Sequence, residues 1–213
     1  MKAIIPGVGC GVPASALHDH ALAAWVRAHG LTVTAHDDDE LDLLRFHAVR
    51  PIQVVWRCGA AARPLHRSLD FGVSRFVVDR PEQMDRLAEN SHGTKYIYLD
   101  EGSPLVVGDR RLKVIGLHGD VDDSDGTVEW GSAAERLLCR AALLKTCGAS
   151  IKRITLSGGS TDMWATGSGE QLAAVASAVD DALREGCARW QLPRPTVSIS
   201  PLALARPTTA AAW

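Results

Sequence analysis

RITLSGGST (residues 153–161) and KVIGLHGDVDD (residues 113–123) each combine a run rich in β-branched residues with a loop of glycine or acidic residues at its carboxyl end. Short runs of this kind that alternate with amphipathic segments indicate strands and helices around a parallel sheet. In a barrel of parallel strands, the loops that follow the strands carry the chemistry. These two loops are therefore the first candidates for a functional site.

Eight such runs occur along the chain, which is the strand number of a (β/α)8 TIM barrel. We expect strands at residues 2–7, 31–35, 52–57, 75–79, 95–100, 113–119, 153–158 and 196–200. The linker EGSPLVVGDRRL (residues 101–112) has no helical period and resembles a hairpin that turns at Gly108 and Asp109. The sequence therefore predicts a barrel in which the helix between strands five and six is missing or replaced by a hairpin.

The composition limits the domain count and the partners. A chain of 213 residues with 46% hydrophobic residues suits one barrel domain over residues 1–213, with a disordered tail expected over about residues 205–213. A net charge of -2 and a pI near 6.4 predict neither a nucleic-acid nor a membrane partner. The short apolar run at the start does not suit a signal peptide, so we expect a cytoplasmic protein.

Acidic residues follow several of the expected strands. Residues 37–40, DDDE, open an amphipathic segment, and we interpret their carboxylates as caps that favour the dipole of the following helix. After the sixth strand, Asp120 and Asp122 with His118 could converge on a hard divalent cation, as in a metal-assisted barrel enzyme. We prefer a solvated acidic turn there, and we predict no metal.

Gly158 and Gly159 form a two-glycine turn directly after the seventh strand. Such a turn lets backbone amides approach a phosphate group without a Cβ in the way. The same pair also suits an ordinary tight exit from a strand. Both interpretations stay open at this stage.

Two longer stretches, HGLTVTAHDDDELDLL (residues 29–44) and FGVSRFVVDRPEQMDRL (residues 71–87), carry a family resemblance. They resemble the barrel domain of the pyridoxal phosphate (PLP) dependent diaminopimelate and ornithine decarboxylases, a fold type III barrel like the N-terminal domain of alanine racemase. The resemblance covers most of the chain from Leu31 onward. It implies an alanine racemase-like TIM barrel, PLP as cofactor and an amino-acid-like ligand, and it leads us to expect that the family's C-terminal β-domain is absent.

The resemblance also assigns individual positions. GLHGDV (residues 116–121) corresponds to a Gly-Leu-His loop, in which Asp120 takes the place of the histidine that stacks on the pyridine ring and His118 matches a first histidine. These two residues are the catalytic candidates of that loop. The glycine-rich phosphate loop and the last strand give the cofactor-binding candidates Ser157, Gly158, Gly159, Ser160 and Ser200.

The family's Schiff-base lysine lies near the carboxyl end of the first strand. With KAIIP (residues 2–6) aligned on that motif, its position holds Ile5, and Lys2 would take the catalytic role only in a shifted register. PLP chemistry needs an imine to hold the cofactor's aldehyde, so we predict that no cofactor binds. A second resemblance, to the single-domain PLP homeostasis proteins through LSGGSTDM (residues 156–163), matches the chain length, and that family needs the same lysine.

Two classes of function follow from these expectations. The preferred hypothesis is a pseudoenzyme, a degenerate relative that binds an amino-acid-like small molecule or a protein partner. The alternative is a working enzyme, either PLP-dependent and decarboxylase-like or racemase-like through Lys2, or metal-assisted through the acidic loop. Trp130 and Trp164, expected after strands six and seven, either cover the barrel mouth or form a homodimer surface there.

Overall fold

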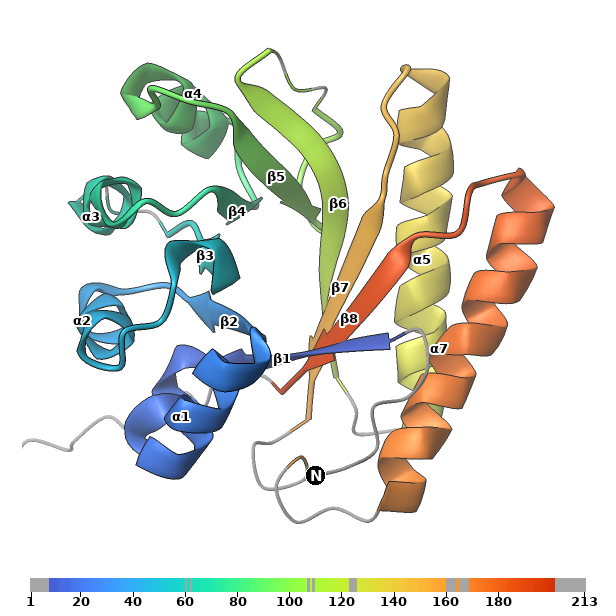
Figure 1. Ribbon diagram of the computed structural model, residues 1–213. Helices are drawn as coiled ribbons and strands as arrows, with labels where there is room; N and C mark the ends of the chain where they lie inside the picture. The colour runs from blue at the N-terminus through green and yellow to red at the C-terminus, as the bar shows by residue number, and fades with distance from the viewer. Residues whose placement is uncertain are drawn as a thin grey trace, which may run out of the picture.

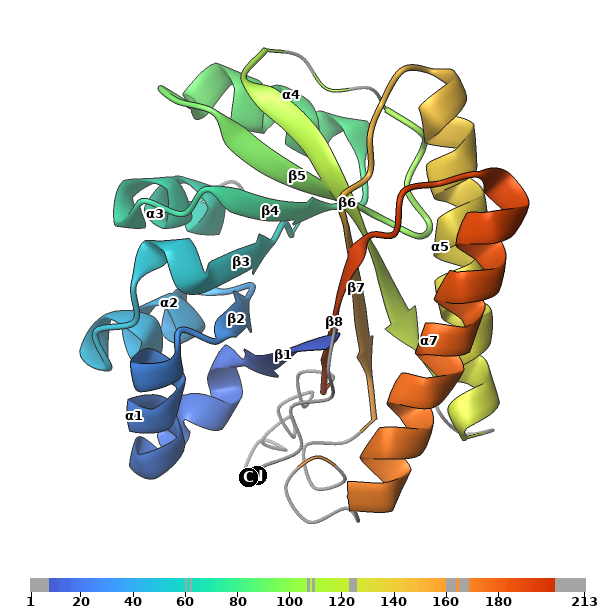
Figure 2. The same cartoon turned by 45° about the vertical axis from the view of Figure 1, so that its right-hand side comes forward.

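The described residues of the computed structural model are 8–59, 61, 63–106, 108, 110–122, 126–159, 164 and 169–201. They form a closed barrel of eight strands in sequence order, and every neighbouring pair is parallel. Helices lie around the outside of the strands (Figure 1), and α5 and α7 run side by side next to β7 and β8 (Figure 2). The predicted (β/α)8 barrel is confirmed.

The strands are β1 (Val8–Pro13), β2 (Thr32–Ala35), β3 (Val54–Arg57), β4 (Arg75–Val78), β5 (Lys95–Asp100), β6 (Leu112–Val121), β7 (Arg153–Gly158) and β8 (Thr196–Ser200). The helices are α1 (His20–His29), α2 (Asp38–Phe46), α3 (Arg63–Phe71), α4 (Pro81–Asn90), α5 (Thr127–Thr146) and α7 (Gly169–Trp190), with short 3-10 helices at Ala14–His18 and Pro51–Gln53. No helix of the described residues is long and apolar enough to cross a membrane.

The first described strand of the barrel lies later than the sequence predicted. It is β1, Val8–Pro13, which pairs with β2 and β8. Residues 2–7, where this strand was expected, lie outside the described residues. The two glycines of β1 made its segment resemble a loop, although an inward-facing glycine is useful where strands crowd together. A Cβ on Gly11 would lie only 3.3 Å from the Cβ of Ser200 on the neighbouring strand.

The linker between β5 and β6 confirms the missing helix. Its described residues between Asp100 and Leu112 form turns and bends without a helix. They also contain no strand pair, so the helix is absent there rather than replaced by a regular hairpin. Asp109, at the expected turn, lies outside the described residues.

Hydrophobic packing is concentrated between the strands and the helices, where Trp56, Phe76, Trp130 and many aliphatic side chains are buried. Inside the barrel the apolar cluster is small, with Val55, Val77, Tyr98 and the half-buried Ile115. The remainder of the interior is polar, whereas bulky branched residues usually fill a TIM barrel. The interior therefore offers hydroxyl and imidazole groups that need hydrogen-bond partners.

The acidic run after β2 has the structural role that the sequence predicted. The Asp37 side chain accepts a hydrogen bond from the backbone N–H of Glu40 at 2.8 Å and caps α2. Glu40 in turn lies 2.8 Å from His36, and this hydrogen bond raises the pKa of His36 against the opposing effect of burial. Asp37 of this run thus caps the helix, and Glu40 binds the neighbouring His36.

Candidate functional site

The centre of the barrel mouth is an ion pair between opposite sides of the barrel. Arg57, the last residue of β3, donates two hydrogen bonds to Asp120 of β6, with nitrogen to oxygen distances of 3.0 Å and 2.7 Å. Two strands, β4 and β5, lie between the partners on one side of the closed ring, and four strands lie between them on the other. The pair therefore ties β3 to β6 across the mouth in the bidentate geometry that is strongest for arginine and carboxylate.

His118 lies directly behind this pair. It is on β6 two residues before Asp120, so both side chains face the same side of the strand. Its Nε2 is 3.1 Å from an Asp120 oxygen, and its Nδ1 is 2.9 Å from the Thr155 hydroxyl of β7. Since the ionised carboxylate can only accept, Nε2 donates to Asp120, while the Thr155 hydroxyl lies between Nδ1 and the Leu117 carbonyl, to which it donates at 3.3 Å.

The charges of the mouth are coupled through Asp120. Burial alone would raise the pKa of Asp120, but hydrogen bonds from His118 and Arg57 outweigh burial and hold that pKa well below its usual range. Burial likewise acts to lower the pKa of Arg57. The carboxylate of Asp120, and more weakly those of Asp100 and Asp79, outweigh burial and raise that pKa above its ordinary value. The mouth thus combines the guanidinium of Arg57 with the carboxylates of Asp120, Asp100 and Asp79.

Beneath the pair, the barrel is nearly closed. Ser157 and Ser200, predicted as cofactor-binding residues, share a hydrogen bond of 2.9 Å. Together with Thr34, Thr155 and other small side chains they line a cavity of about 20 Å³, which is room for roughly one water molecule. A larger ligand would have to lie above this floor, at the level of Arg57 and Asp120.

The glycine turn after β7 is explained by packing. A Cβ on Gly158 would lie 2.7 Å from the Trp130 ring and 2.9 Å from the carbonyl oxygen of Val121. Gly159 has a φ of +71°, which favours glycine. The tight-exit interpretation therefore accounts for both residues, and their role in phosphate binding stays a prediction. Ser160 lies outside the described residues.

Trp130 and Trp164 close this turn from outside the barrel. Trp130 belongs to α5, and the two rings meet edge to face with centroids 6.1 Å apart. The Trp164 indole N–H donates to the Gly158 carbonyl at 2.9 Å, and both side chains are buried. The expectation that they form an exposed partner surface is therefore wrong, whereas a homodimer as such stays a prediction.

No amine of the described residues reaches the mouth. Lys95, Lys113 and Lys152 lie at or just before the first residues of β5, β6 and β7, and Lys145 lies in the last turn of α5. All four are at the amino-terminal end of the barrel. The carboxyl end of β1, where the resemblance expects the lysine, is Pro13. Lys2 and Ile5 lie outside the described residues.

The acidic loop after β6 is only partly described, because residues 123–125 lie outside the described part of the chain. Within that part, no group of three or more His, Cys, Asp or Glu side chains could hold a metal ion. Asp120, the first residue of the expected metal set, is instead bound to Arg57 and His118. The metal hypothesis therefore gains no support from the geometry of the described residues.

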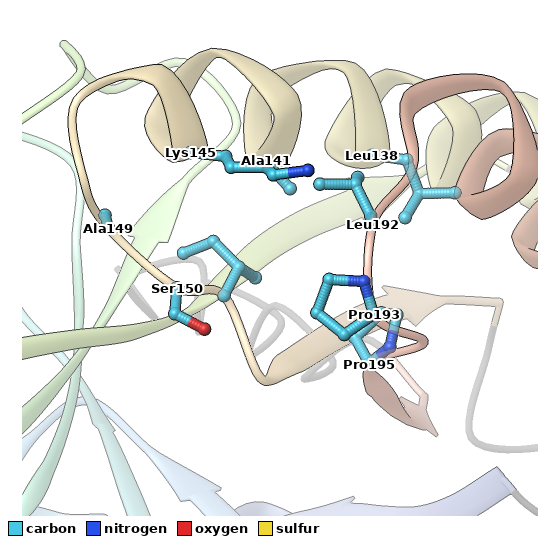
Figure 3. Close-up of a pocket in the computed structure, with 9 residues that line it drawn as sticks. Leu138, Ala141, Lys145, Ala149, Ser150, Leu192, Pro193 and Pro195 are labelled. Carbon is cyan, nitrogen blue, oxygen red and sulfur yellow. The ribbon is translucent and has the colours of Figure 1, made fainter.

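A second hollow lies away from the mouth, between α5 and the segments that lead into β7 and β8 (Figure 3). Its lining is apolar except for Ser150 and Lys145, and the Lys145 ammonium donates to the Gln191 carbonyl at 2.7 Å. It contains no acid and base pair. The mouth, where the charged side chains converge, is therefore the candidate site.

Sequence reasoning found His118 and Asp120 but missed Arg57 and Thr155. The only signal for Arg57 was its place at the end of the run IQVVWR, directly where a barrel loop begins. Thr155 gave no signal, because a threonine inside a strand is ordinary. Both became visible only through the pairing of β6 with β7 and the closure of the barrel.

Comparisons with known proteins agree on the fold. No protein-family model matches the chain. A diaminopimelate decarboxylase from Actinosynnema pretiosum subsp. auranticum is 27% identical in an alignment that covers 83% of this chain and 48% of the length of that protein. Diaminopimelate decarboxylase from M. jannaschii superposes with a TM-score of 0.73 at 12% identity, covering 91% of this chain and 53% of that chain. The structure of SrLDC in complex with PLP and cadaverine superposes with a TM-score of 0.72 at 19% identity, covering 92% of this chain and 54% of that chain. The chain spans about half the length of these relatives.

Proposed function

We propose that this homologue of diaminopimelate decarboxylase, which has the fold type III barrel of the PLP-dependent decarboxylases, is catalytically degenerate and binds an amino-acid-like small molecule at its mouth. The ion pair between Arg57 and Asp120 carries the proposal. It puts charge and hydrogen-bonding groups at the position where the family resemblance expects a stacking imidazole. A carboxylate offers a ring no aromatic surface.

The described residues do not fit PLP. An imine needs an amine, and the described lysines lie at the other end of the barrel, while β1 ends in Pro13. The turn at Gly158 is packed against Trp130 and closed by Trp164. Carboxylates at the mouth would also repel a phosphate dianion. These observations support the proposal that the chain does not use the cofactor chemistry of its relatives.

A PLP-dependent enzyme that uses Lys2 is the second candidate. It is favoured by the relatives, because SrLDC was solved with PLP and cadaverine. Lys2 precedes β1 by several residues, and its position is not described. The two candidates differ in one chemical respect, which is whether PLP becomes covalently attached to the chain.

The charges of the mouth suit a ligand with both a carboxylate and an ammonium group. Arg57 can hold a carboxylate in a bidentate manner if the ligand displaces Asp120. Asp79 and Asp100 lie close enough to Arg57 to raise its pKa, and their carboxylates would bind the ammonium group of the ligand. A diamino acid therefore matches the mouth better than a simple anion does.

We expect L-lysine to raise the melting temperature of the protein, by about 3–6 °C at ten times its dissociation constant. Cadaverine, which has the two amines without the carboxylate, should stabilise it less. Arg57→Gln should reduce the effect of lysine to no more than that of cadaverine and keep the effect of cadaverine, because only the carboxylate contact is lost. Differential scanning fluorimetry with both ligands measures these shifts.

Arg184→Gln is the matched control, since Arg184 pairs with Asp181 on the exposed face of α7. It should respond to both ligands as the unchanged protein does. The proposed ligand class is refuted if lysine gives no shift at millimolar concentration, or if Arg57→Gln keeps the full lysine shift.

A further inference from the structure

The amino-terminal end of the barrel is basic, in contrast to the acidic mouth. Apart from Asp109, which lies outside the described residues, the four positions before each of the strands β2–β8 contain no Asp or Glu. They contain Arg50, Arg110, Arg111, Lys152 and Arg194. The net charge of -2 therefore hides a separation of charge along the barrel axis.

Two arginines of this end point into the barrel. Val77 lines the interior cavity, and Arg75 lies two residues before it on β4, so Arg75 faces the same side. By the same argument Arg153 on β7 faces the interior, because Thr155 lines the cavity. Both residues begin their strands, which places them at the amino-terminal opening.

The guanidinium of Arg75 is only partly satisfied. One of its nitrogens donates to the Ile52 carbonyl at 2.5 Å, and the Tyr98 hydroxyl is a second hydrogen-bond partner, while its Nε is buried and has no hydrogen-bond partner among the described residues. An unpaired buried donor costs free energy that a ligand can recover. Burial lowers the pKa of Arg75, and the positive charge of Arg153 lowers it as well, against the opposing contribution of Tyr98.

A glycine between the two arginine-bearing strands makes room for the ring of Tyr98. Gly116 of β6 lies between Tyr98 of β5 and Arg153 of β7 in the sheet register. A Cβ at Gly116 would be 2.4 Å from the Tyr98 ring and 3.0 Å from the Arg153 carbonyl oxygen. The Tyr98 ring therefore lies across Gly116, and its hydroxyl is a hydrogen-bond partner of Arg75. No carboxylate of the described residues forms an ion pair with either Arg75 or Arg153.

We propose that the amino-terminal opening of the barrel binds a phosphate-type oxyanion between Arg75 and Arg153, with Lys113 beside it. Guanidinium groups bind tetrahedral oxyanions in a bidentate manner, and a dianion would compensate the repulsion of two like charges. The exposed Arg153 leaves the opening accessible from solvent. This site is separate from the mouth and does not depend on the function proposed for it.

Inorganic phosphate is the probe, titrated against sodium chloride at equal ionic strength and pH 7. The melting temperature should rise by about 3–6 °C more in phosphate than in chloride at ten times the dissociation constant, and the effect should saturate. Arg153→Gln should abolish this difference. Glycerol 3-phosphate is tested in parallel. If it binds more tightly than inorganic phosphate, the site takes a phosphomonoester; if inorganic phosphate binds more tightly, the site takes the free anion.

Arg75→Lys is the second variant, because loss of the partly buried charge in Arg75→Gln can unfold the protein. It should weaken phosphate binding at least several-fold by isothermal titration calorimetry, since lysine lacks the bidentate fork. Arg184→Gln and Arg57→Gln should bind phosphate unchanged, which separates this site from the mouth. Equal melting temperatures in phosphate and chloride, or phosphate binding that survives Arg153→Gln, would overturn the proposal.

Discussion

Replacing Trp130 by alanine is expected to lower the free energy of unfolding by about 3–5 kcal/mol. The side chain is 1% exposed, packs against Gly158 and meets the ring of Trp164. Its loss leaves a cavity between α5 and the turn after β7, where the backbone of the turn limits collapse. Urea denaturation followed by circular dichroism measures the change.

Val128→Ala is the control on the same helix, since Val128 is 69% exposed and should change stability by less than about 0.5 kcal/mol. A loss below 1 kcal/mol for Trp130→Ala would show that the indole pair does not hold the glycine turn. The packing explanation of Gly158 would then fail, and its use as a phosphate turn would regain weight.

Replacing Asp120 by asparagine should destabilise the fold by about 1–2 kcal/mol at pH 7. The variant keeps the shape of the side chain but removes the charge between Arg57 and the buried His118. The expected value is modest because the Asp120 side chain is 45% exposed and solvent screens the pair. Urea denaturation from pH 7 down to pH 3 measures both the size and the pH dependence of the effect.

The direction of the pH dependence follows from the lowered pKa of Asp120. The stabilisation is complete above the unfolded pKa of about 4 and is lost as the pH falls from there toward the folded pKa. The difference between the unchanged protein and Asp120→Asn should therefore be constant above about pH 5 and shrink below about pH 4. Asp42→Asn, in an exposed pair with Arg67, is the control and should show a smaller difference. A difference that grows toward low pH would contradict the network.

The strand pattern predicted most of the barrel because seven of the expected strands are continuous β-branched or aromatic runs, whose local preference agrees with their place in the sheet. The exception is β1, where two glycines and a proline give no strand preference. Its position is set by pairing with β2 and β8, which are distant in sequence. Non-local pairing of this kind cannot be read from a single segment.

The same limit applies to the candidate site. His118 and Asp120 were recognisable because they belong to one short segment with a family resemblance. Arg57 is separated from Asp120 by 63 residues and meets it only because the barrel closes. The sequence alone made Asp120 a candidate metal ligand, whereas in the closed barrel Asp120 forms an ion pair with Arg57.

The proposed function requires that no amine of this chain holds PLP. Incubation with a small molar excess of PLP, borohydride reduction and peptide mapping by mass spectrometry tests this directly, with Lys2→Ala as the control. We predict no stoichiometric adduct on any lysine and no absorbance band that the control lacks. A stoichiometric adduct on Lys2, absent from Lys2→Ala, would contradict the proposed loss of cofactor binding and identify a working cofactor site.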